Sequence, residues 1–269
     1  MLVCGLALAI GACAPIGPFE PAVPSPTDAK AMDMAVRDLL DRARAARASG
    51  EFEAATRLYR DAVTASATAE ISSRVLVELG ELLTRMNQSA DAYTALTSAL
   101  DRAQDPAVRE SAYVAFGHLY QRLRRYAESV TFYDKALELN PRNARALVGR
   151  GVALDISGLH DQAQASYMAA LAADPGDTRA QNNLALSYAF AGHFSKAVEI
   201  LHPMATSPGS TAQLRQNLAL VYGLMGNGEL AGSILRRDLD EATVRTNLRN
   251  YEILRRLPNP AEALAAASG

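Results

Sequence analysis

The sequence contains little cysteine, few aromatic residues and almost no net charge. Of its 269 residues two are cysteine, none is tryptophan and 6% are aromatic, and the formal net charge is −2 at pH 7. Two cysteines are too few for a disulfide framework or a four-cysteine metal site. A chain without a basic excess lacks the electrostatic footprint of a nucleic-acid partner, so we expect none. The low aromatic content favours many small contacts between helices over one large core.

Motifs of catalysis and ligand binding are missing as well. The sequence has no HExxH, no GxSxG, no phosphate-binding glycine loop and no predicted strand. None of the four histidines stands at a metal-ligand spacing: His118, His160, His193 and His202. We therefore expect a protein that is not an enzyme, with no catalytic residue, no metal site, no cofactor and no small-molecule substrate.

A pair of helices with large and small residues on one seam occupies the middle of the chain. Residues 111–141 predict two amphipathic helices joined by a short turn, and Pro141 ends the second. On the first helix Gly117 stands among aromatic residues at helical spacing, so the partner helix can approach it closely. On the second helix Tyr133 has small residues one turn before and after it. Neither helix can bury its apolar face alone, so the pair needs neighbours.

The neighbours come from repetition of this unit. In the next unit Gly151 takes the place of Gly117, and Tyr167 takes that of Tyr133. A helix pair that recurs every 34 residues, with this order of large and small residues, resembles the tetratricopeptide repeat. The resemblance implies an all-α, right-handed superhelical solenoid over residues 28–257. Turn signals divide it into six hairpins: 28–48 with 52–66, 70–86 with 89–103, 107–122 with 126–139, 143–156 with 160–173, 177–190 with 194–206, and 210–224 with 227–237.

One further helix is predicted after the hairpins. Its apolar positions form a single stripe while arginines occupy the other faces, which is typical of a terminal capping helix. The stripe consists of Val244, Leu248, Tyr251 and Leu254. Pro258 and Pro260 follow and interrupt an alanine-rich end, so we expect residues 258–269 to be a flexible tail.

The first residues of the chain are uncharged and apolar. Residues 1–12 are too short to span a bilayer and end in small residues, which is typical of a signal peptide. The run from Ile10 to Cys13 resembles a bacterial lipobox, which implies cleavage before Cys13 and attachment of lipid to it. No basic residue precedes the motif, and a start codon assigned too late would explain this. The alternative is a buried or disordered apolar leader.

The residues after Cys13 extend the same interpretation. By resemblance to lipoproteins, Ala14 directs the anchored protein to the outer membrane, with its body facing the periplasm. Residues 13–27 contain five prolines and predict an extended tether between the lipid and the solenoid.

The first helix of each hairpin lines the concave side of a solenoid of this kind. By resemblance to the family, the lining positions are Arg145, Val152, Ile156, Arg179, Asn182, Asn183, Leu186, Phe190, Gln216, Asn217 and Leu220. Asn183 and Asn217 occupy the place that hydrogen-bonds the ligand backbone in peptide-binding relatives. An apolar row of Val152, Leu186 and Leu220 lies beside them. The alternative is that the apolar residues only pack helix against helix and that the asparagines are solvated.

The last third of the chain carries a more specific resemblance. The runs 182–188, 207–226 and 246–251, together with the lipobox, tether and repeats, resemble the TadD family of lipoproteins of tight-adherence (Flp) pilus assembly. This resemblance implies a pilotin-like scaffold that assists assembly or placement of the outer-membrane secretin, with other pilus-assembly proteins as partners. The alternatives are a pilotin-like lipoprotein of another type IV pilus and a general periplasmic scaffold for envelope enzymes. A peptidoglycan-acting enzyme is disfavoured because catalytic residues are missing.

Overall fold

The computed structural model describes the backbone of residues 26–267 and the side chains of residues 34–266. Every element in that range is an α-helix: α1 (Pro26–Ala48), α2 (Phe52–Ala65), α3 (Ala69–Arg85), α4 (Ser89–Arg102), α5 (Pro106–Arg122), α6 (Tyr126–Leu139), α7 (Ala144–Ile156), α8 (His160–Ala173), α9 (Thr178–Phe190), α10 (Phe194–Thr206), α11 (Ala212–Leu224), α12 (Gly228–Leu235), α13 (Glu241–Leu254) and α14 (Pro260–Ala267). The first twelve pair into the six predicted hairpins, so the predicted all-α solenoid is confirmed. None of these helices is both long and apolar enough to cross a membrane. The predicted signal peptide, Cys13 and the tether up to residue 25 lie outside the described residues.

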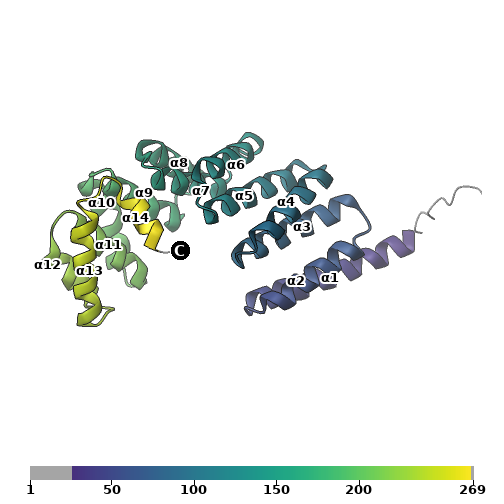
Figure 1. The fold of residues 1–269 in the computed structure, drawn as a ribbon, viewed down its shortest axis with the longest axis horizontal. Helices are drawn as coiled ribbons and strands as arrows, with labels where there is room; N and C mark the ends of the chain where they lie inside the picture. Colours follow the sequence, from purple (N-terminus) through teal and green to yellow (C-terminus); the bar gives the residue numbers. More distant parts are fainter. Residues whose placement is uncertain (1–25, 268–269) are drawn as a thin grey trace, which may run out of the picture.

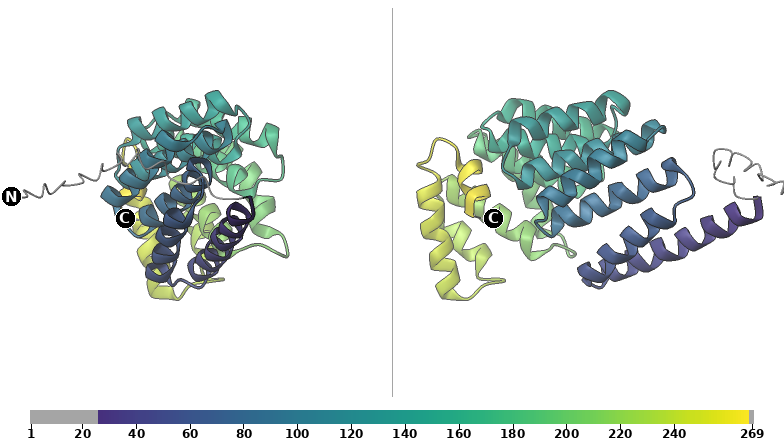
Figure 2. Two further views of the ribbon diagram at one scale, coloured as in Figure 1. Left: turned by 90° about the vertical axis from the view of Figure 1, so that its right-hand side faces the viewer. Right: turned by 45° about the vertical axis from the view of Figure 1, so that its right-hand side comes forward.

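The helices follow an arc (Figure 1). Helices α1 and α2 lie at one end of the arc, α5 to α8 form its middle, and α11 to α13 lie at the other end. Two further views show the same curved stack of hairpins from other sides (Figure 2). The first helices contact one another directly, because α7 packs against α5 and α9, and α9 packs against α11. These first helices therefore form the wall of the concave side.

Glycines opposite large residues set the spacing within the hairpins. A Cβ atom added at Gly117 would lie 2.5 Å from Cε1 of Tyr133, and one added at Gly151 would lie 2.5 Å from Cε1 of Tyr167. Both tyrosines are almost completely buried. The large-to-small pairing predicted for the repeating unit is therefore the packing that the structure shows.

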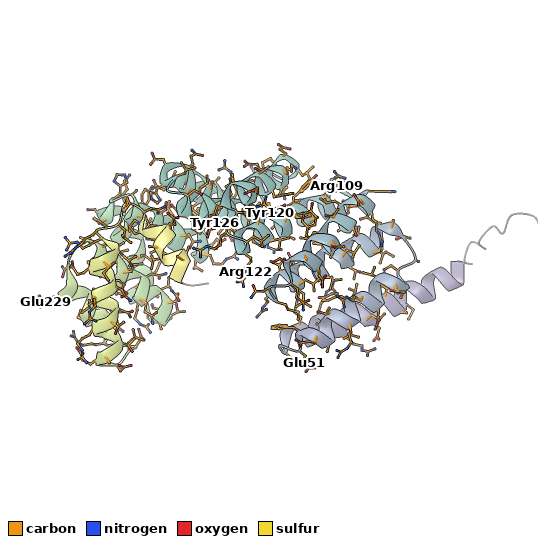
Figure 3. The ribbon with its side chains drawn as sticks, in the orientation of Figure 1. Glu51, Arg109, Tyr120, Arg122, Tyr126 and Glu229 are labelled. Atoms are coloured by element: carbon orange, nitrogen blue, oxygen red, sulfur yellow. The ribbon has the colours of Figure 1, made fainter. Side chains whose placement is uncertain are left out.

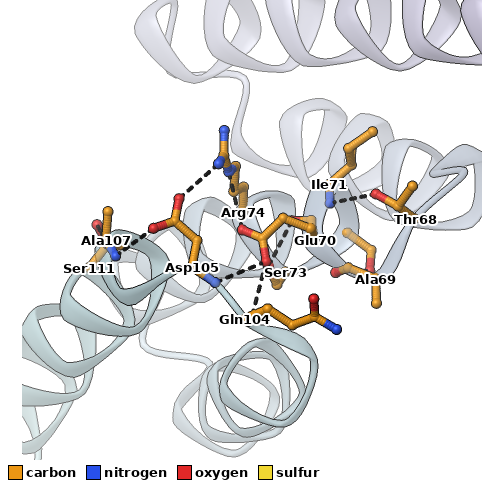
Figure 4. Close-up of polar contacts among 11 residues, drawn as sticks. Thr68, Ala69, Glu70, Ile71, Ser73, Arg74, Gln104, Asp105, Ala107 and Ser111 are labelled. Atoms are coloured by element: carbon orange, nitrogen blue, oxygen red, sulfur yellow. Dashed lines mark hydrogen bonds and ion pairs between the residues drawn. The ribbon is translucent and has the colours of Figure 1, made fainter.

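Carboxylates at the start of the first helices hold the loops between hairpins. Glu70 at the start of α3 accepts hydrogen bonds from the backbone N–H groups of residues 104 and 105, at 3.0 and 3.3 Å (Figure 4). Asp105 caps α5 and pairs with Arg74 on α3 at 2.9 Å. In the next unit Glu110 accepts a hydrogen bond of 2.9 Å from the side-chain amide of Asn140. These two loops are thus each fixed to the preceding first helix.

Helix α13 closes the last hairpin, as the apolar stripe predicted. Val244, Tyr251 and Leu254 are buried, and Leu248 packs against the same cluster. Gly223 on α11 leaves room for the Tyr251 ring, because a Cβ atom there would overlap with the ring. The stripe covers the apolar face that α11 and α12 would otherwise expose.

Replacing Val244 by aspartate tests this capping role. Val244 has no exposed surface, so the charge would be buried without a partner, which destabilises the terminal unit by about 2 kcal/mol. In a solenoid the loss stays local, so α13 should undock and the bared face should self-associate in sedimentation velocity runs. Ile253→Asp is the matched control, because Ile253 lies on the same helix and is 55% exposed. A monomeric Val244→Asp variant with the original melting curve would contradict the prediction.

The structure differs from the predicted flexible tail at residues 260–267, which form α14. Pro260 stands at the first position of this helix, where proline is favourable because its missing N–H is not needed there. Asn259 caps the helix, since its Oδ1 accepts a hydrogen bond of 3.2 Å from the N–H of Glu262. Alanine then supplies high helix propensity. Figure 1 shows α14 on the inner side of the arc.

Candidate functional site: the concave groove

A groove with a volume of about 340 Å³ lies on the concave side between α7, α9, α11 and α14. Seven of the eleven positions predicted to line the concave face stand in its wall: Val152, Ile156, Asn183, Leu186, Phe190, Asn217 and Leu220. The predicted apolar row is therefore brought together by three successive first helices. Asp155, Tyr167 and Gln213 complete the solenoid's part of the wall, and the sequence reasoning missed them.

The asparagines on the groove wall are linked across two repeats. The side-chain amide of Asn217 donates to Oδ1 of Asn182 at 2.7 Å, and its Oδ1 accepts from Gln213 at 3.0 Å. The amide of Asn182 donates in turn to Oδ1 of Asn183 at 3.2 Å. Asn217 is buried, and its amide nitrogen and its oxygen each have a partner, of which Asn182 joins α11 to α9. The amide nitrogen of Asn183 has no hydrogen-bond partner within the described chain, so Asn183 is the one that can serve a ligand.

The remaining predicted positions lie away from this groove. Arg145 pairs with Glu81 on α3 at 2.8 Å. Arg179 is exposed and pairs with Asp177, the capping residue of its own helix, at 3.3 Å. Asn182 does not line the groove but bonds to Asn183 and Asn217, which do. Gln216 is half-buried on α11, outside the groove lining.

His118 lies beside the Arg145–Glu81 pair. Burial lowers the pKa of His118, Arg145 lowers it further, and Glu81 acts in the opposite direction. The imidazole is therefore neutral at neutral pH. It adds no charge to the surrounding pocket, which Arg47 and Arg85 also line.

A second, wider hollow of about 780 Å³ continues from the groove toward α3 and α5. Val152, Ile156 and Ala265 line both hollows, so the two are continuous. The wider hollow carries three arginines: Arg85, Arg122 and Arg124. Arg122 lies at the middle of the arc near Tyr126, which also lines this hollow (Figure 3). The sequence reasoning did not find this basic end, because Arg85 lies on another repeat, 37 positions before Arg122 along the chain.

Helix α14 covers part of the groove. Ala261, Leu264 and Ala265 contribute to the lining opposite Leu186 and Phe190. The amide of Asn259 donates a hydrogen bond of 3.0 Å to the backbone carbonyl of Ile156 at the end of α7. The signal that could have revealed this helix is the Asn-Pro pair before an alanine-rich segment, which is also a helix start.

A buried polar cluster centred on Asp155 lies at the groove wall. The carboxyl of Asp155 receives hydrogen bonds from Ser187 at 2.7 Å, His160 at 2.8 Å and Tyr167 at 3.0 Å. Burial, the neighbouring Asp155 charge and their hydrogen bond raise the pKa of Tyr167 well above its usual value. Asp155 stands between the serine and the histidine, so the histidine does not contact the hydroxyl that it would have to activate. The cluster is a structural joint between α7, α8 and α9.

The solenoid has counterparts among known proteins. Residues 114–178 match the tetratricopeptide repeat family. A tetratricopeptide repeat protein from Parabacteroides merdae ATCC 43184 superposes with a TM-score of 0.65 over 87% of this chain and 92% of its own, at 18% identity. The fold is the tetratricopeptide-repeat solenoid.

Two other proteins are also similar to this chain. PilW, described as a widely conserved type IV pilus biogenesis factor, has a TM-score of 0.64 over 80% of this chain and 94% of its own, at 21% identity. The protein y4yS of Sinorhizobium fredii (strain NBRC 101917 / NGR234) is 42% identical over 69 residues. That match covers 26% of this chain and 38% of y4yS.

A tetratricopeptide-repeat solenoid is typically a non-enzymatic scaffold that binds protein partners. Among the side chains of residues 34–266, no group of three or more from histidine, cysteine, aspartate or glutamate is placed to hold a metal ion. The groove wall offers apolar surface, one available amide and a basic end, which suits a segment of another protein.

Proposed function

We propose that this protein is a lipid-anchored, periplasm-facing scaffold of Tad (Flp) pilus assembly that acts as a pilotin for the outer-membrane secretin. The lipobox ending at Cys13, the proline tether and the TadD-like runs in the last third of the chain support this role. The lipid on Cys13 would hold the solenoid at the outer membrane, and the tether would let the concave face reach the secretin. Other pilus-assembly proteins are further candidate partners.

The groove between α7, α9 and α11 is the observation that carries the proposal. Leu186 is half-buried at its centre, between Val152 on one repeat and Leu220 on the next. This row takes up apolar side chains, and the amide of Asn183 can donate to a backbone carbonyl of the bound segment. A flexible segment loses entropy when it is ordered, so the affinity should be modest.

The similarity to PilW supports the pilus context. PilW is a type IV pilus biogenesis factor, and it shares the arc of helical hairpins over most of its length. The shared fold provides the same kind of concave surface. The resemblance of residues 182–188 and 207–226 to the TadD family points to the Tad system among pilus systems.

Leu186→Asp tests this function. The substitution places a charge in the apolar row, so capture of secretin from solubilised membranes should fall by about tenfold or more. Asn183→Ala removes one hydrogen bond and should weaken capture by about fivefold. Leu139→Asp is the matched control, because Leu139 is 42% exposed at the end of α6 and lines none of the hollows described. Circular dichroism and thermal melting check that each variant folds. If a well-folded Leu186→Asp variant captures secretin as wild type does, the proposed role of the groove is wrong.

A further inference from the structure

We propose that the groove is a helix-binding site and that α14 is its resident, displaceable occupant. The geometry also points to the partner's chemistry: a helix that is longer than α14, with larger apolar side chains on one face, followed by acidic residues. The inference deepens the proposed function, and it rests on that function for the identity of the partner as a segment of the secretin.

Helix α14 is seated in the groove as a bound helical peptide would be. Pro260 and Ala261 are buried, with 5% of Ala261 exposed. Ala263 and Leu264 pack against the apolar cluster that α9 to α13 share. Asn259 fixes the start of the helix by capping it and by donating to the carbonyl of Ile156. An Asn-Pro start and a face of small side chains are therefore what this groove accommodates.

The side chains of α14 leave part of the groove unfilled. Pro260, Ala261 and Ala265 face the solenoid with small side chains. A hollow of about 340 Å³ therefore remains between α14 and the wall. That volume is many times what one water molecule needs. A partner helix with larger apolar side chains at these positions would contact Leu186 and Phe190 more extensively. Helix α14 is thus a ligand that a better-fitting helix can replace.

The arginines beside the carboxyl end of α14 indicate the charge expected on the rest of the partner. Ala265 borders the wider hollow, which holds Arg85, Arg122 and Arg124. Glu81 also borders it but is paired with Arg145 at 2.8 Å. A helix that continues beyond the length of α14 would bring its carboxyl end, with its partial negative charge, to these arginines. Acidic side chains after the apolar face would pair with them.

The covalent link between α13 and α14 makes α14 a competitor. Residues 255–259 join the two helices, so the effective concentration of α14 at the groove is on the order of millimolar. A free helix of similar intrinsic affinity must displace it. Release of α14 should therefore raise the apparent affinity for a free helix by at least about tenfold.

Two substitutions of the same kind on opposite faces of α14 test the inference in the full chain. Ala261→Glu puts a charge on the buried face and should undock the helix, whereas Ala266→Glu changes an exposed position and should leave it docked. The probe is a fluorescein-labelled peptide with the sequence of residues 258–267 followed by four aspartates, read by fluorescence anisotropy. We expect Ala261→Glu to bind it at least about tenfold more tightly than wild type and Ala266→Glu to bind it as wild type does. A peptide ending in four lysines should bind more weakly, and added salt should reduce the difference.

Equal binding by wild type and by a well-folded Ala261→Glu variant would overturn the inference, and so would no binding to that variant. If Ala261→Glu does not fold, Asn259→Ala replaces it, because it removes the cap and the link to Ile156 without adding a charge. Secretin capture by Ala261→Glu is measured separately. Peptide binding as expected with no gain in secretin capture would contradict the proposed function and leave the helix-binding groove intact.

Discussion

Replacing Gly117 by leucine should lower the free energy of unfolding by about 3 kcal/mol. A Cβ atom at this position would lie 2.5 Å from Cε1 of Tyr133, well inside any normal contact distance. The tyrosine cannot move aside, because Gly149 on α7 also lies against its ring and the tyrosine is 0% exposed. Its hydroxyl is also held by Gln121 at 2.9 Å. The leucine side chain must therefore force α5 and α6 apart.

Thermal and urea unfolding of four variants would measure this effect. Gly151→Leu should behave as Gly117→Leu does, because Gly151 contacts Tyr167 in the same way one repeat later. Gly228→Leu is the control, since a Cβ atom there meets nothing within 4 Å. Gly117→Ala should be destabilised less than Gly117→Leu because it adds only one carbon. A Gly117→Leu variant as stable as wild type would refute the packing between α5 and α6.

The hairpins could be predicted from the sequence because each depends on residues that lie close together along the chain. Helix α8 spans His160–Ala173, as predicted from the turn signals and periodicity around it, and α6 spans Tyr126–Leu139 likewise. Gly117 and its partner Tyr133 lie on the two helices of one hairpin, and so do Gly151 and Tyr167. The repeat period then presents the same local evidence again along the chain.

The candidate site was harder to predict because it depends on contacts between distant residues. The hydrogen bond from Asn259 to Ile156 joins positions 103 apart, and the Arg145–Glu81 pair joins positions 64 apart. No periodicity carries such pairings, since each results from how far the arc bends. Pro258 and Pro260 predict an interrupted helix, although proline at the first position, as at Pro260, also suits a helix start.

The asparagines show the same limit between two successive repeats. Asn183 and Asn217 hold equivalent places in the sequence pattern, yet Asn217 is buried and bonded to two neighbours. The difference comes from their neighbours. Gln213 and Asn182 both bond to Asn217, whereas Asn183 accepts a hydrogen bond from Asn182 alone. Sequence equivalence therefore located both residues on the wall but did not distinguish their roles.

Replacing Asp155 by alanine should have the largest effect on stability, about 4 kcal/mol. Three donors, on Tyr167, His160 and Ser187, would lose their acceptor in a region where Ser187 is 0% and Tyr167 is 1% exposed. Each buried donor without a partner costs about 1–3 kcal/mol, and the missing carboxyl also leaves a small cavity. Gln121→Ala is the matched control, because Gln121 holds the equivalent place in the preceding repeat and serves Tyr133 and the carbonyl of Gly149.

Urea unfolding should show that Asp155→Ala lowers the free energy of unfolding clearly more than Gln121→Ala does. The double variant Asp155→Ala with Tyr167→Phe should recover part of it, because one of the donors left unpaired is removed. Asp155 also joins α7 to α9, which form two walls of the groove, so the α14-derived peptide should bind this variant more weakly even where it remains folded. If Asp155→Ala unfolds at the wild-type urea concentration, the three hydrogen bonds do not stabilise the joint. In that case the spacing of the groove walls must be set by the apolar contacts of Leu154, Tyr167 and Leu184 alone.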